Sequence, residues 1–109
     1  MKSSSIRTVV TIKHGDEILL FNLDNIVAMR GDRSYTIFYM KGNGEYKTTK
    51  TLKAWNESMN SDQMIRVHKS FMINQNEVLS INKSQRTLSL SNNMTVPYSR
   101  RFNLKSLLV

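Results

Sequence analysis

Short runs of β-branched and aromatic residues, divided by tight-turn signals, most limit how this chain can fold. Residues 6–23 hold two such runs, separated by the turn signal His14-Gly15-Asp16. The run at residues 35–40 leads into Gly42-Asn43-Gly44, which supplies the positive φ angles that a tight hairpin turn requires. Runs of this length are strands, and turns this tight join antiparallel neighbours.

The pattern continues through the second half of the chain. Residues 65–74 show strand-like alternation, and residues 77–97 are typical of a β-meander. In the meander, Leu88 and Leu90 alternate with serines ahead of a turn at Asn92-Asn93. The chain is therefore predicted to form a mainly β domain of small antiparallel sheets.

Two short helices interrupt the strands. Leu52, Trp55 and Met59 have the spacing of one helix face, with Thr48 or Thr49 as the predicted N-cap.

A second helix is predicted at the C-terminus, capped by Ser99, with Leu104, Leu107 and Leu108 as its apolar residues. Arg100 and Arg101 would then lie in its first turn, where the helix dipole disfavours cations. A bound anion would turn that cost into a gain.

The net charge narrows the class of partner. Sixteen lysines and arginines against eight acidic residues give a formal charge of +8 in 109 residues, the size of one domain. Nucleic acid and anionic membrane surfaces are the usual partners of so basic a chain. The chain has no cysteine, signal-peptide pattern or apolar run near the ~18 residues of a membrane span, so we expect a cytoplasmic location.

Catalysis finds little support in the sequence. His14 and His68 are the only histidines, and the acidic residues are scattered without spacing suited to acid–base work. Gly42-Asn43-Gly44 lacks the remainder of a dinucleotide fingerprint. We therefore expect no enzyme, and no residue pattern indicates a metal site or a cofactor.

Basic residues gather instead in loops and at the ends of elements. Arg33 lies in the polar stretch of residues 30–34, Lys69 follows His68, and Arg100-Arg101 follow Pro97. Arg30, Arg66 and Lys105, taken singly, are interpreted as solvated surface charges. Tyr35, Phe38, Tyr39 and Phe71 could form a base-stacking platform, but core and cross-strand packing explains them better.

Two linked motifs resemble the LytTR-type DNA-binding domain of bacterial transcription regulators. The first reads Arg66-Val67-His68-Lys69-Ser70-Phe71-Met72-Ile73-Asn74, and the second reads Pro97-Tyr98-Ser99-Arg100-Arg101. The resemblance runs from residue 6 to residue 108 and leaves residues 1–5 as a polar tail, so the predicted domain covers residues 6–109. It implies an elongated fold of small packed antiparallel sheets with short helices.

The resemblance also implies the site. Family members bind double-stranded DNA through loops and element ends placed in successive major grooves, often as pairs on repeated sites. Matched position by position, the contacting residues are Arg33, Ser34, Tyr35, Lys69, Arg100 and Arg101. Lys69 stands where arginine is commoner, which replaces a bidentate fork by a point charge. His68 and Asn74 are expected to be structural.

The resulting hypothesis is sequence-specific double-stranded DNA binding in transcription control. A homodimer on DNA is compatible with it, as is a receiver domain or other regulatory protein if the chain is a fragment of a longer regulator. The alternative is a regulatory module that binds a protein or ligand and touches nucleic acid without specificity, and RNA binding ranks third.

Overall fold

Ten short strands and one α-helix make up the domain, in a computed structural model that describes residues 9–59 and 61–108. The predicted polar tail, residues 1–5, lies outside the described residues. The strands are β1 (Val9–His14), β2 (Glu17–Asn22), β3 (Ile26–Asp32), β4 (Tyr35–Met40), β5 (Glu45–Thr48), β6 (Met64–His68), β7 (Phe71–Asn74), β8 (Val78–Asn82), β9 (Thr87–Leu90) and β10 (Thr95–Pro97). The helix is α1 (Leu52–Met59), and single 3-10 turns cover Leu23–Asn25, Gln75–Glu77 and Leu104–Ser106.

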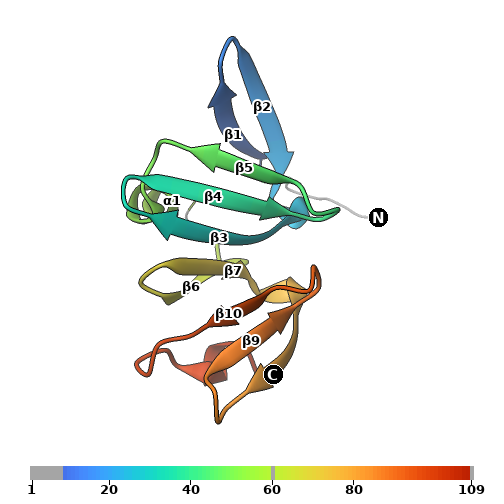
Figure 1. The fold of residues 1–109 in the computed structure, drawn as a ribbon, viewed down its shortest axis with the longest axis vertical. Coiled ribbons are helices and arrows are strands. Elements are labelled where there is room, and N and C mark those ends of the chain that lie inside the picture. Colours follow the sequence, from blue (N-terminus) through green and yellow to red (C-terminus); the bar gives the residue numbers. More distant parts are fainter. Residues whose placement is uncertain (1–8, 60, 109) are drawn as a thin grey trace.

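The strands form three antiparallel sheets. A five-stranded sheet in the order β5-β4-β3-β7-β6 occupies the middle of the molecule, with the β1–β2 hairpin at one end and the three-stranded sheet β10-β9-β8 at the other (Figure 1). The prediction of a mainly β fold built from small antiparallel sheets is confirmed.

The central sheet separates two hydrophobic cores. On β3, Met29 packs with the residues from the β1–β2 hairpin and α1, whereas Ala28 packs with those from the three-stranded sheet and the C-terminal segment. Residues 26–29 of β3 are all buried, because this strand has a core on both faces. The pairing of β3 with β4 shifts at Val27, which allows adjacent residues of β3 to serve the same core.

The predicted turns and the first helix are present. Gly15 lies at φ 63° in the β1–β2 turn, Gly42 and Asn43 have positive φ between β4 and β5, and Asn93 does so before β10. Leu52 and Trp55 are the buried residues of α1, as their spacing predicted. The N-terminal cap is Thr51, whose Oγ1 accepts the Ala54 amide at 3.1 Å, so the prediction of Thr48 or Thr49 is wrong.

Thr48 has another task. Its hydroxyl is buried, donates to the Thr36 carbonyl at 3.0 Å and accepts the Trp55 indole N–H at 2.9 Å. Thr36 in turn donates to the Lys50 carbonyl at 2.8 Å. These bonds tie α1 to the first residues of β4.

The predicted C-terminal α-helix is absent from the described residues. Ser99–Phe102 forms a tight turn closed by the Phe102 amide on the Ser99 carbonyl at 3.0 Å. The single 3-10 turn that follows is capped by Asn103, whose Oδ1 accepts the Lys105 amide at 3.0 Å. Leu104 and Leu107 still pack on the second core, so their apolar spacing reflects burial without a continuous helix.

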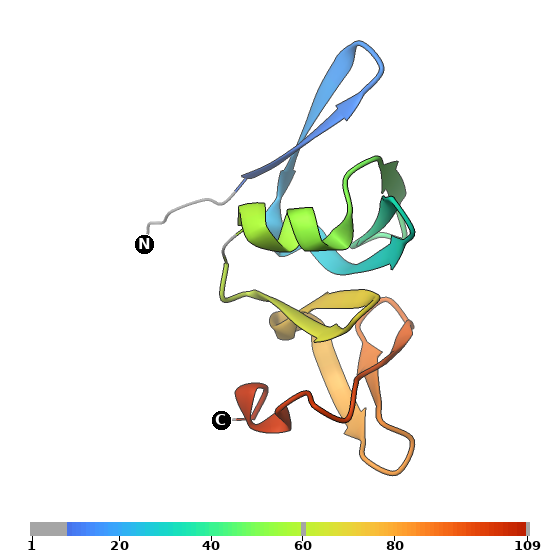
Figure 2. The same cartoon turned by 90° about the vertical axis from the view of Figure 1, so that its left-hand side faces the viewer.

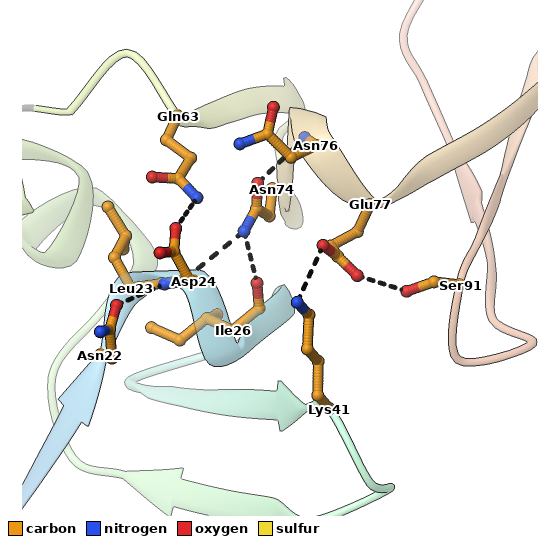
Figure 3. Close-up of polar contacts among 10 residues, drawn as sticks. All are labelled: Asn22, Leu23, Asp24, Ile26, Lys41, Gln63, Asn74, Asn76, Glu77 and Ser91. Carbon is orange, nitrogen blue, oxygen red and sulfur yellow. Dashed lines mark hydrogen bonds and ion pairs between the residues drawn. The ribbon is translucent and has the colours of Figure 1, made fainter. Parts of the chain in front are cut away.

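Asn74 joins the two halves of the fold. Its fully buried side chain donates from Nδ2 to the Ile26 carbonyl at 3.0 Å, and its Oδ1 accepts the Asn76 amide at 3.0 Å (Figure 3). One amide thus links the start of β3 with the turn after β7, and the prediction of a structural role is confirmed. At the same end of the sheet, the Glu77 carboxylate forms an ion pair with Lys41 at 3.4 Å and accepts a hydrogen bond from the Ser91 hydroxyl at 2.6 Å.

We expect Asn74→Ala to lower the free energy of unfolding by about 2–3 kcal/mol, because it leaves a buried carbonyl and an amide without partners. Urea unfolding followed by circular dichroism measures the change. Asn56→Ala, at an exposed position on α1, is the control and should be neutral or slightly stabilising. Equal stability of the two variants would contradict the structural role of Asn74.

Candidate nucleic-acid interface

All six residues predicted to contact DNA are exposed. Arg33 and Ser34 form the two-residue turn between β3 and β4, and Tyr35 is the first residue of β4. Lys69 lies in the turn between β6 and β7. Arg100 and Arg101 are the two central residues of the Ser99–Phe102 turn.

Backbone hydrogen bonds bring these three segments to one side of the molecule. β3 pairs with β7 so that Arg30 lies opposite Phe71, and the Gly31 amide donates to the Ser70 carbonyl at 2.8 Å. The β3–β4 and β6–β7 turns therefore lie at the same end of the central sheet, on the left of Figure 1 and facing the viewer in Figure 2. The Ser99 amide donates to the Val67 carbonyl at 2.8 Å, which attaches the closing turn to β6.

A bulge in β6 makes that last bond available. The pairing of β6 with β7 shifts between Arg66 and His68, so Val67 is an extra residue in the strand. The extra residue of a bulge has no partner across the ladder. Its carbonyl is the one that accepts the Ser99 amide.

The β3–β4 turn holds an arginine in an unfavourable backbone conformation. Arg33 has φ 59°, a left-handed region that glycine and asparagine adopt readily and that costs other L-residues about 1–2 kcal/mol. Tyr35 is 39% exposed, and the Lys47 Nζ lies 4.1 Å from the centre of its ring. The turn and the adjacent strands thus place two cations and a partly exposed aromatic ring at the surface.

Two side chains of β6 hold the β6–β7 turn in place. His68 Nδ1 accepts the Ser70 amide at 3.1 Å, which is the local structural role expected for this histidine. Arg66 donates from Nη2 to the Lys69 carbonyl at 2.6 Å and from Nε to the His68 carbonyl at 3.4 Å.

A groove of about 380 Å³ lies between this turn and the closing segment. Three cations line it together with hydroxyl, amide and imidazole groups, and no carboxylate is among its lining residues. The lining residues are Arg66, Val67, His68, Lys69, Ser99, Arg101, Phe102, Asn103 and Ser106. Cations and hydrogen-bond donors around one hollow suit an anion such as a phosphate.

The structure corrects the electrostatic reasoning on Arg100 and Arg101. Since they lie in a turn and no α-helix begins there, no helix dipole acts on them. Arg101 lines the groove together with Lys69, whereas Arg100 is not among its lining residues.

Two arginines interpreted as solvated charges make specific contacts. Arg66 holds the β6–β7 turn, as described above. Arg30 donates from Nε to the Tyr39 hydroxyl at 3.0 Å, and this hydrogen bond raises the pKa of the Arg30 guanidinium above its usual range. The Arg30 contact depends on the pairing of β3 with β4 and the Arg66 contacts depend on the shape of the β6–β7 turn, so neither follows from the sequence motifs.

Neither a metal centre nor a membrane span emerges from the described part of the chain. Residues 9–59 and 61–108 contain no group of three histidine, cysteine or acidic side chains suited to a metal ion. No helix there has the length and apolarity to cross a bilayer.

The LytTr DNA-binding domain family matches residues 16–108 of the chain. The chain belongs to the LytTR family of DNA-binding domains. It is similar in structure to the LytTr DNA-binding domain of a Bacillus cereus protein described as a methyl-accepting/DNA response regulator. That likeness has a TM-score of 0.77 and 23% identity, and covers 94% of this chain and 99% of that one, which supports the fold. No curated protein matches the chain.

Membership of the LytTR family confirms the resemblance read from the two motifs. It identifies DNA as the partner of this domain and assigns it to a family of binding modules, not of enzymes. The groove and the three exposed segments carry cations, which are the side chains that neutralise DNA phosphates.

We expect the Arg33→Gly variant to be more stable than the wild type but to bind DNA more weakly. Relief of the left-handed conformation should raise the free energy of unfolding by about 0.5–1 kcal/mol, net of the extra entropy that glycine gives the unfolded chain. Loss of the charge should weaken binding to a labelled DNA duplex. Urea unfolding and fluorescence anisotropy measure the two effects.

Asn43→Gly, in the β4–β5 turn at the opposite end of the sheet, is the matched control. It should change neither quantity appreciably, because asparagine tolerates positive φ. A destabilised Arg33→Gly variant, or one with full DNA affinity, would contradict the assignment of strain to a binding residue.

Proposed function

We propose that this LytTR domain binds double-stranded DNA in a sequence-specific manner to control transcription. The observation that carries the proposal is the groove in which Lys69 and Arg101, from segments far apart in the sequence, come together without a carboxylate. The β3–β4 turn, with Arg33, Ser34 and Tyr35, supplies a second contact beside it.

Contacts in successive major grooves need a domain at least as long as one turn of the duplex. The longest axis of this domain measures 45 Å, whereas one turn of duplex rises about 34 Å. The β3–β4 and β6–β7 turns and the closing segment are held to one another along one side of the molecule. A duplex lying along that side meets all three segments.

Different segments take different tasks in this proposal. Arg101 has the planar fork that pairs with guanine O6 and N7, a contact worth roughly 1–3 kcal/mol of discrimination. Lys69 places a point charge in the same groove, suited to a phosphate or to guanine. Arg100 neutralises a neighbouring phosphate, and Arg33, Ser34 and Tyr35 reach an adjacent major groove.

The wider assembly is also part of the proposal. The Bacillus cereus neighbour is described as a response regulator, which favours a role for this domain in a two-component system, under control of a receiver domain or another regulatory protein. Two copies would bind repeated half-sites, as a homodimer on DNA, in the cytoplasm.

Random-site selection tests the function directly. We expect the wild-type domain to enrich a defined sequence, with two copies of a half-site, and a steep fall in affinity between two salt concentrations. Uniform, salt-sensitive binding to all sequences would instead favour a protein- or ligand-binding module with nonspecific DNA affinity.

Arg101→Ala is expected to relax the base preference at one position of the selected site. Arg100→Ala, in the same turn, is the matched control: it should weaken all sequences alike and reduce the salt slope by about one, as for a phosphate contact. Repeating the selection with each variant gives the comparison. An unchanged base preference in Arg101→Ala would show that Arg101 does not read a base.

A further inference from the structure

The Arg66 guanidinium donates hydrogen bonds to two backbone carbonyls of the β6–β7 turn, which carries Lys69. Its Nη2 lies 2.6 Å from the Lys69 carbonyl and its Nε 3.4 Å from the His68 carbonyl. Both acceptors belong to residues that line the groove, and the Arg66 side chain is only partly exposed. The shorter contact is charge-assisted and is made to the residue whose side chain is proposed to bind DNA.

The surrounding bonds place this turn between the other two segments. Ser70, next to Lys69, accepts the Gly31 amide from the end of β3, and its own amide donates to His68 Nδ1. Val67, next to Arg66, accepts the Ser99 amide of the closing turn. A turn fixed at these points presents Lys69 in one position relative to Arg101.

We propose that Arg66 is a positioning residue for DNA recognition, which fixes the Lys69 backbone so that the Lys69 ammonium enters the groove beside Arg101. This inference rests on the proposed function of Lys69. The planar guanidinium suits this role because its Nε and Nη2 reach two carbonyls in a fixed geometry, which a flexible lysine ammonium at residue 66 does not reproduce.

A direct contact between Arg66 and a DNA phosphate would look similar in a simple binding assay. The two roles differ in how they combine with Lys69. A positioning residue acts through Lys69, so its effect disappears when the Lys69 side chain is removed, whereas independent phosphate contacts add.

The first test is a double-mutant cycle of wild type, Arg66→Lys, Lys69→Ala and the double variant, on the duplex obtained by random-site selection. Because residues in one network couple strongly, we expect Arg66→Lys to lower affinity about tenfold in the wild type and less than about twofold beside Lys69→Ala. Any change in the selected sequences that Lys69→Ala produces should also appear in Arg66→Lys. Equal losses in both backgrounds, or no loss in either, would overturn the proposal.

The second test needs no DNA. Amide hydrogen exchange by NMR should show faster exchange of the Ser70 amide in Arg66→Lys, while the Gln85 amide, which is bonded to Asn82 Oδ1 in the β8–β9 turn, keeps its rate. Arg86→Lys, an arginine of that other turn, is the matched variant and should leave Ser70 unchanged. An unaltered Ser70 rate in Arg66→Lys would overturn the positioning role.

The two tests separate the possible failures. If the wild-type domain selects no sequence, the proposed function fails and the recognition role of Arg66 fails with it. If the domain selects a sequence but the cycle is additive or the Ser70 rate is unaltered, only the role of Arg66 fails.

Discussion

Two backbone hydrogen bonds on the β6–β7 hairpin hold the candidate interface together. The Ser70 carbonyl receives the Gly31 amide and the Val67 carbonyl receives the Ser99 amide, each at 2.8 Å. Residues more than thirty positions apart in the sequence thereby become neighbours. Gly31 also allows α1 to approach β3 closely, because a Cβ there would lie 3.1 Å from Leu52 Cβ, which is tighter than ordinary van der Waals contact. The geometry of the interface therefore follows from the main chain of the central sheet, with side chains free to face solvent.

Stability and binding draw on different residues. Met29 and Ala28 of β3 serve the two cores, and Asn74 satisfies buried backbone groups at the end of the sheet away from the turns. The proposed DNA contacts lie in turns or, for Tyr35, at the first residue of a strand, and none of them belongs to either core. Arg33 goes further, since its positive φ costs stability that glycine at the same place would recover. Arg86, in the β8–β9 turn, has a φ of 54° as well, so the strain at Arg33 supports binding only together with the place of Arg33 in the proposed interface.

The sequence predicts the strands, the hairpins and α1, because alternation and turn chemistry are local properties. It fails where a long-range contact decides. The spacing of Leu104 and Leu107 indicates a helix, but the bond from Ser99 to Val67 and the tight turn after it leave only one 3-10 turn. The role of Arg66 is missed for a different reason: its partners are only two and three residues away, but they are carbonyls of a turn whose shape depends on a bulge. The six candidate contacts came from the family motifs, and their exposure is compatible with that role.

The arrangement of charge along the central sheet gives the groove its chemistry. At one end, Lys41 is paired with Glu77. At the other, Arg66, Lys69 and Arg101 surround a hollow with no acid among its lining residues. Cations gathered around one groove repel one another, and an anion that enters would relieve the repulsion and gain their hydrogen bonds. Arg101 therefore needs no helix dipole to explain it: the like charges gathered around the groove favour an anion, and this is the driving force in the proposed binding of DNA.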